Sequence, residues 1–117
     1  MTPEQIKDEL RNFTGTEHYY KHPFGNLFTQ GVKFLIDECQ CWWLIDACIS
    51  WQFDKKVSEQ EFIAFKLKVN AEKSAVLYIE DGNYNVIATQ EIEFTDFPLD
   101  EIIIWLSNGV FYLPSEH

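Results

Sequence analysis

The sequence predicts an α+β fold, with two or three N-terminal helices packed on one face of a roughly five-stranded antiparallel sheet formed by the C-terminal half. Two observations predict this fold. Apolar residues recur at helical spacing up to about residue 53, whereas from residue 61 onward they alternate with polar residues, as in a half-exposed strand. The 117 residues contain no linker, repeat or low-complexity tract, which indicates one domain, 1–117, with a helical part at about 1–53 and the sheet at about 61–114.

Two helix starts are recognisable in the N-terminal half. Thr2 is a favoured N-cap and Pro3 a favoured first helical residue, so a helix is expected to begin there and to end near Asn12–Gly15. Thr29 is expected to cap a second helix, Gln30–Glu38, in the same way.

The segment 41–53 is the most apolar in the chain and contains three of its four tryptophans, so it must be buried. As a helix it would place Asp46 and Ser50 on one side and apolar residues on the other. Residues 45–53 also alternate between apolar and polar positions, as a strand would. The length of the segment and the helical pattern before it favour the helix, in which Asp46 lies at the edge of a largely apolar surface.

Three successive strands are expected in the C-terminal half, at Glu61–Val69, Ala75–Glu80 and Asn85–Phe94. Asp81-Gly82 is a strong hairpin signal because the turn requires positive φ angles. One face of the third strand is predicted to carry Val86, Ala88, Ile92 and Phe94. Pro98 then interrupts the pattern, since the residue before a proline is restricted to extended geometry.

The last apolar segment, 101–114, has two interpretations. The acids at its start and Asn108-Gly109 could begin and end a helix. Three consecutive β-branched residues and the same Asn-Gly pair between apolar runs favour a hairpin, which we expect. Both faces of that hairpin are apolar. One can pack on the helices, and the other is expected to form the interface of a homodimer or to be covered by the N-terminal segment.

Charge is distributed unevenly along the chain, whose formal net charge is −10. Residues 1–73 hold eleven acids and nine bases and contribute −2, whereas residues 74–117 hold eight acids and no base and contribute −8. This potential attracts basic proteins and repels nucleic acid, whose binding depends on Lys and Arg contacts to phosphates. The predicted partner-binding residues are Glu80, Asp81, Glu91, Glu93, Asp96, Asp100 and Glu101.

The predicted function is therefore that of a small acidic protein-interaction module whose partner has a basic surface. One form of it would mimic nucleic acid and block a nucleic-acid-binding protein. No direct nucleic-acid binding and no membrane association are expected, because no apolar run is long enough to span a bilayer. The polar N-terminus is unlike a signal peptide and the three cysteines suit reduced thiols, so a cytoplasmic location is expected.

A catalytic role is less favoured, because the chain has no Gly-rich phosphate loop and no Ser or Cys nucleophile motif, and no cofactor is expected. The segment around residue 20 nevertheless carries acid–base groups. The catalytic candidates are Glu17, His18, Tyr20 and His22, together with Asp46. A small-ligand pocket between helices and sheet is a further alternative, lined by Trp42, Trp43 and Trp51.

A zinc site is also considered and not expected. His18 and His22 are four residues apart, which puts two ligands on one helical face, and Cys39 and Cys41 could complete a set of four. However, the two cysteines lie within an apolar run, and the chain contains no Cys-x-x-Cys pair.

Several motifs together resemble a known family. They are Thr-Gly-Thr-Glu with Tyr-Tyr and His (14–22), Thr-x-Gly-Val (29–32), Trp-Leu-Ile-Asp-Ala (43–47), Thr-Asp-Phe-Pro-Leu (95–99) and Leu-Pro-Ser-Glu-His (113–117). Over nearly its whole length the chain resembles a family of short bacterial proteins catalogued as a domain of unknown function, largely cyanobacterial and often carried on mobile or plasmid-borne DNA. The resemblance implies a stand-alone domain. It carries no activity, so no catalytic residue is transferred from it.

Overall fold

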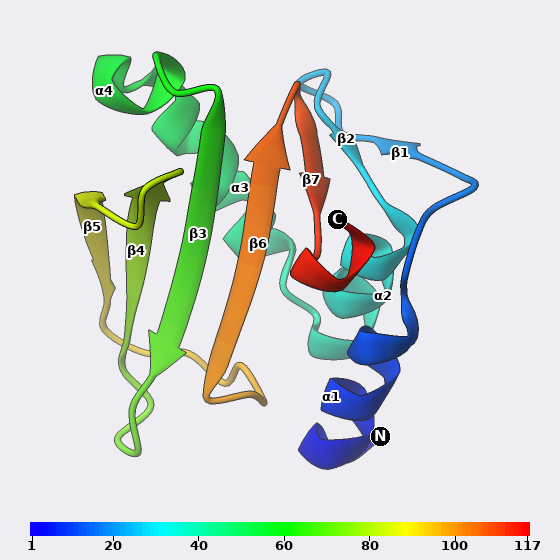
Figure 1. Ribbon diagram of the computed structural model, residues 1–117. Coiled ribbons are helices and arrows are strands. Elements are labelled where there is room, and N and C mark those ends of the chain that lie inside the picture. The colour runs from blue at the N-terminus through cyan, green and yellow to red at the C-terminus, as the bar shows by residue number, and fades with distance from the viewer.

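The computed structural model describes all residues, 1–117, and shows helices covering one face of a single sheet (Figure 1). The helices are α1 (Pro3–Asn12), α2 (Gln30–Cys39), α3 (Trp42–Ser50) and α4 (Lys55–Ser58), and the 3-10 turns are η1 (Trp51–Phe53) and η2 (Pro114–Glu116). The strands are β1 (Tyr20–Lys21), β2 (Leu27–Phe28), β3 (Phe62–Val69), β4 (Ala75–Asp81), β5 (Val86–Ile92), β6 (Glu101–Ser107) and β7 (Val110–Tyr112). None of the helices has both the length and the apolar character needed to cross a membrane.

The sheet has seven strands in the order β1-β2-β7-β6-β3-β4-β5, so the prediction of about five strands, all from the C-terminal half, was wrong. The two additional strands, β1 and β2, come from the N-terminal half. Each is only two residues long, which is too short to show the alternation that identifies a strand. All neighbouring strands are antiparallel except β2 and β7, which run parallel.

Four of the strands form a Greek key, because β6 returns to pair with β3 on the far side from β4 and β5. The connection 93–100 makes this return at the lower end of the sheet in Figure 1. Phe97 and Leu99 of this connection are buried, and the Phe97 ring packs edge-on against Trp43 with 6.5 Å between the ring centroids. The connection therefore closes the lower end of the core between sheet and helices.

The predicted helices are confirmed and begin at the predicted caps. The Thr2 hydroxyl accepts a hydrogen bond from the N–H of Gln5, and the Thr29 hydroxyl accepts one from Val32. The 41–53 segment is helical rather than extended, as α3 followed by η1. Helices are not confined to the predicted helical part, however, since Asp54 accepts from the Lys56 N–H and caps the short helix α4.

The hydrophobic core lies between α2, α3 and the inner face of the sheet. The central strand contributes Ile63, Phe65 and Leu67, all almost fully buried. α2 and α3 lie behind the sheet in Figure 1, and α1 packs chiefly against α2 and η2. The opposite face of the sheet, which we call the outer face, is covered by none of the four helices (Figure 1).

β5 departs from the face predicted for it. A β-bulge near its start inserts Ile87, so that Ala88 faces the core while Val86 pairs with Glu80 and is 51% exposed. Phe94 lies beyond the end of the strand and is 72% exposed. The extra residue moves the side chains before it to the other face of the sheet. The periodicity of the sequence alone does not reveal such a bulge.

The hairpin expected at 101–114 is confirmed as β6 and β7. The turn residues Asn108 and Gly109 have φ angles of 53° and 76°, the left-handed region that asparagine and glycine adopt most readily. Ile104, Leu106 and Phe111 point into the core, so the remaining apolar side chains of the hairpin lie on the outer face.

Candidate functional site

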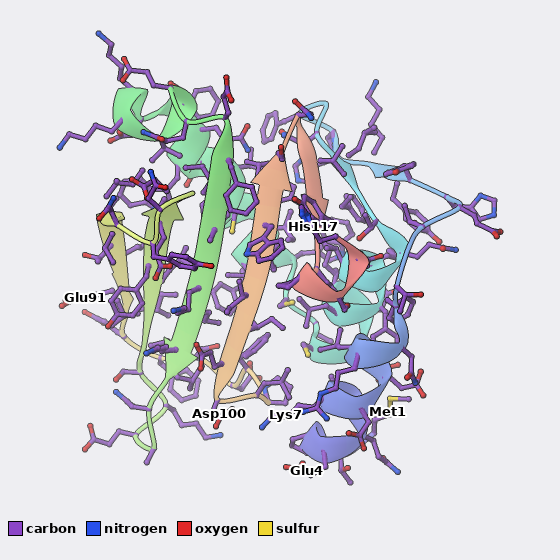
Figure 2. All side chains as sticks on the ribbon, viewed as in Figure 1. Met1, Glu4, Lys7, Glu91, Asp100 and His117 are labelled. Atoms are coloured by element: carbon purple, nitrogen blue, oxygen red, sulfur yellow. The ribbon has the colours of Figure 1, made fainter.

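The outer face carries an aromatic cluster around the indole of Trp105. Its ring centroid lies 5.3 Å from that of Phe62, 5.9 Å from that of Tyr112 and 5.3 Å from that of His117, all in edge-on contact. His117 in turn stacks on Tyr112 with an interplanar angle of 12°. Figure 2 shows His117 over β6 and β7, on the side of the sheet that faces the viewer. We call Phe62, Trp105, Tyr112 and His117 the aromatic cluster.

Strand register brings these side chains together from distant parts of the chain. Trp105 pairs with Ala64 on β3 and with Tyr112 on β7, and Phe62 is its diagonal neighbour. None of the four was a candidate from the sequence. The signal that could have found them was the apolar character of both faces of the final hairpin.

Glu116 holds the end of the chain against α2 and so positions His117. Its carboxylate accepts hydrogen bonds from the Thr29 hydroxyl (2.6 Å), the Gly31 N–H (3.3 Å) and the Leu113 N–H (3.0 Å). A carboxylate at the N-terminus of a helix also interacts favourably with the helix dipole. The Ser115 hydroxyl donates to the carbonyl of Leu10, which ties the same turn to α1.

Charges of both signs lie beside the aromatic cluster on the outer face. Lys66 Nζ lies 3.5 Å from Glu80 Oε2 on the neighbouring strand. Lys68 is paired across strands with Glu101, and its Nζ lies 5.9 Å from the centroid of the Tyr78 ring. The middle of this face is therefore close to electrically balanced.

Five of the seven predicted partner-binding acids are spread across the lower part of the sheet, from β5 to β6 and the connection between them, and we call this region the acidic end. They are Glu91, Glu93, Asp96, Asp100 and Glu101. All five are exposed, and Figure 2 shows Glu91 on β5 and Asp100 below β6. Asp100 forms a salt bridge with Lys7 of α1 at 3.3 Å, and the other four acids form none. Two bases lie near them: Lys68 is opposite Glu101, and the Lys73 carbonyl accepts a hydrogen bond from the N–H of Thr95, next to Asp96.

Glu80 and Asp81 lie at the opposite end and already have intramolecular roles. Glu80 is buried beside Lys66. The carboxylate of Asp81 accepts hydrogen bonds from the backbone of Asn85 (3.0 Å) and Asn83 (2.8 Å), and these bonds lower the pKa of Asp81. The structure thus separates these two acids from the acidic end.

Among the catalytic candidates, His22 and Asp46 are brought together, with 2.9 Å between Nε2 and Oδ1. The imidazole is 5% exposed, and its Nδ1 accepts a hydrogen bond from the Phe24 N–H at 3.1 Å. Both ring nitrogens are therefore engaged, with the proton on Nε2. This arrangement anchors the 20–28 segment to α3 and leaves no nitrogen for acid–base work.

Glu17, His18 and Tyr20 do not join this pair. Glu17 and His18 are exposed, and the Glu17 backbone N–H is bound to the Gln30 side chain. The Tyr20 ring stacks on Phe28, and Lys33 Nζ lies 5.7 Å from its centroid. The five candidates do not converge on one point.

The candidate metal ligands are also kept apart. Cys39 and Cys41 are buried in the core, whereas His18 is exposed and His22 is bound to Asp46. No group of three His, Cys, Asp or Glu side chains in the chain could hold a metal ion. The three tryptophans proposed as pocket walls also separate: Trp42 packs on Phe28, Trp43 on Phe97, and the Trp51 indole N–H donates to Gln90.

We expect the three thiols to be inert in the folded protein. Burial raises the pKa of Cys41 to about 12 and that of Cys39 to about 11, and it also raises the pKa of Cys48. Native protein at pH ~8 should therefore resist iodoacetamide, while urea-unfolded protein should be alkylated at all three sites, as mass spectrometry would show. Rapid labelling of native protein would contradict this burial.

The same shifts predict how stability depends on alkaline pH. The folded state keeps its thiol protons above the ordinary pKa of 9.0, so their contribution to stability is complete below that pH. It is lost as pH rises from there towards 12, because the unfolded chain releases the protons first.

One protein family matches this sequence over almost its full length. The family is described as "Family of unknown function (DUF6876)", and its sequence model matches residues 4–117. No curated protein and no solved structure matches the chain.

Proposed function

Since the chain belongs to the DUF6876 family, whose function is unknown, the family assigns it no activity, and we propose that it is a small acidic module that binds a protein partner. The proposed binding surface combines the aromatic cluster of the outer face with the acidic end of the sheet.

The observation that supports this proposal is a sheet face with a solvent-facing aromatic cluster that no helix covers. Trp105, Tyr112 and Phe62 are only partly buried, and His117 is exposed. Aromatic residues are enriched at the centres of protein interfaces, where they supply most of the binding energy. Four strands of seven or eight residues and one of three give a face of roughly 500 Å².

The size of this face also supports a contribution from the acidic end. A stable complex buries about 800 Å² on each partner, more than the flat part of the outer face provides. A partner that reached the acidic end would supply the remainder. Its complementary surface would be basic, because Glu91, Glu93, Asp96 and Glu101 are exposed and form no salt bridge, and the whole chain carries −10.

The proposed setting is the cytoplasm of a bacterium. Three free, buried thiols suit a reducing compartment. The resemblance to proteins carried on mobile DNA suits a more specific role, in which the acidic end mimics nucleic acid and blocks a nuclease or another nucleic-acid-binding protein. Direct nucleic-acid binding is not part of the proposal, because the charge opposes it.

Removal of three charges from the acidic end should weaken partner binding. The variant carries Glu91→Gln, Glu93→Gln and Glu101→Gln, and we expect its affinity for the protein captured from the native host to fall about tenfold. The matched control carries Glu17→Gln, Glu38→Gln and Glu59→Gln, the same change of charge on exposed acids elsewhere, and should bind like wild type. Affinity should also fall as salt rises, because exposed charges are screened.

Trp105→Ala tests the other half of the surface. Loss of a central aromatic anchor costs about 2 kcal/mol or more, roughly thirtyfold in affinity, and a thermal melt would check that the variant is folded. Binding that resists salt and survives both variants would contradict the proposal. A dimer in solution that Trp105→Ala converts to monomer would assign the outer face to a second copy of the chain instead.

A further inference from the structure

A cavity of about 610 Å³ opens at the upper end of the sheet, between α4 and the turn that joins β6 to β7. Figure 1 shows both elements at the top of the molecule, at the opposite end of the sheet from the acidic end. The floor of the cavity is apolar and consists of Val57, Ile63 and Leu106, all buried. Polar side chains form its walls: Gln52, Ser58, Gln60, Glu61, Ser107 and Asn108. The volume is within the range of small-molecule sites, about 300–1,000 Å³.

Gln52, which lines the cavity, has a buried side-chain donor without a hydrogen-bond partner. The Gly109 carbonyl can only accept, and Asn26 Nδ2 donates both to it and to Gln52 Oε1, each at 3.4 Å. These two bonds fix which end of the Gln52 amide faces Asn26. The other end, Nε2, is buried and has no hydrogen-bond partner. A buried donor without an acceptor is unfavourable, so an oxygen supplied by a ligand would stabilise this side chain.

The opposite wall presents acceptors. The Ser58 hydroxyl donates to the Lys55 carbonyl, and Gln60 Nε2 donates to that of Lys56, so the Ser58 and Gln60 side-chain oxygens remain free to accept. Glu61 adds a carboxylate that is in no ion pair. Three acceptors, one of them negative, match the three N–H donors of an ammonium group.

The charges around the cavity favour a cation as well. Glu61 is the only charged residue that lines it. The nearest bases in the sequence belong to α4, where Lys55 is 89% exposed and bound to Glu59 at 3.8 Å, and neither Lys55 nor Lys56 lines the cavity. The net charge of −10 adds a long-range attraction for cations and opposes anions.

We propose that this cavity binds a small primary amine that also carries a hydroxyl or carbonyl oxygen, as amino alcohols and amino sugars do. The ammonium group binds Glu61, Ser58 and Gln60, and the ligand oxygen accepts a hydrogen bond from Gln52 Nε2. Gln52 Nε2 is buried in the ligand-free protein, so it reaches the ligand by rotation about the terminal torsion, which has a broad energy well. The rotation exchanges the 3.4 Å bond between Asn26 Nδ2 and Gln52 Oε1 for the bond to the ligand. This site shares no residue with the proposed protein-binding surface.

Titration with glucosamine, followed by NMR of the backbone and side-chain amides, tests the proposal. The expected result is a saturable shift of the side-chain signals of Gln52 and Gln60 and of the backbone signals of the 107–109 turn. N-acetylglucosamine, which has the same ring without the charge, should bind at least about tenfold more weakly, as expected for the loss of a charge-assisted hydrogen bond. Ethanolamine should shift the same signals.

Two variants distinguish binding of the amine at this site from the general electrostatic attraction of cations to an acidic protein. Glu61→Gln removes the carboxylate and should weaken glucosamine binding by about tenfold or more. Glu38→Gln removes the same charge from an exposed acid that forms no salt bridge and lies outside the cavity, and it should leave binding within about twofold. The proposal would be overturned if neither amine shifted these signals or if N-acetylglucosamine bound as well as glucosamine. It would also be overturned if the two variants weakened glucosamine binding equally. None of these results bears on the protein-binding function, which Glu91, Glu93 and Glu101 test.

Discussion

Replacement of Phe111 by alanine is expected to lower the free energy of unfolding by about 3–5 kcal/mol. Phe111 is fully buried, pairs with Phe28 across the parallel β2–β7 contact, and packs on Phe65 with 6.1 Å between ring centroids. Truncation removes the burial of an aromatic ring and leaves a cavity among three elements. Since a small domain is stable by about 5–15 kcal/mol, the loss is a large share of the total.

Urea denaturation followed by circular dichroism would measure this change as a lower midpoint. Val110→Ala is the matched control on the same short strand, because Val110 is only half-buried and faces the opposite side. Its expected loss is under about 1 kcal/mol. Equal effects of the two variants would mean that β7 does not place Phe111 in the core.

Gly31→Ala is expected to destabilise the protein by about 1–3 kcal/mol, the opposite sign to the usual effect of alanine in a helix. A Cβ at this position would lie 2.6 Å from Glu116 Oε1 and 2.7 Å from Leu113 Cδ1. The carboxylate would be pushed away from the N-terminus of α2 and lose its bonds to Thr29 and Gly31. Thermal unfolding would report the loss as a lower midpoint.

Two comparisons isolate the cause. At Gly15 a Cβ would meet nothing within 4 Å, so Gly15→Ala should be neutral or slightly stabilising. In a Glu116→Ala background the penalty of Gly31→Ala should shrink, because the carboxylate is gone and only the contact with Leu113 remains. An unchanged penalty in that background would show that Glu116 does not limit the space at Gly31.

The parts of the fold that could be predicted from the sequence depend on local signals. Thr2 and Thr29 mark helix starts through hydrogen bonds to residues three positions on. Asn108-Gly109 marks the final hairpin, because few residues tolerate its backbone angles. β1 and β2 lack any such signal, since each has only two residues and β2 pairs with β7, more than 80 residues away.

The candidate site was less predictable, because it depends on which strands are neighbours. The aromatic cluster unites residues 62, 105, 112 and 117 only once β6 lies between β3 and β7. Seven acids were predicted from the sequence to bind a partner, but only the register separates Glu80, buried beside Lys66, from Glu101 at the other end. His22 and Asp46 were both candidates, and the sequence did not indicate that the Phe24 N–H would occupy the second nitrogen.

The attachment of residues 110–116 to β2 and α2 has a consequence for the order of folding during synthesis. The ribosome releases β2 and the start of α2 long before it makes β7 and Glu116, which pair with them. Until then the first third of the chain lacks the strand that pairs with β2 and the Glu116 carboxylate that binds the start of α2. We therefore expect this part to remain protease-sensitive on stalled nascent chains and to become resistant only after residue 116 has left the exit tunnel.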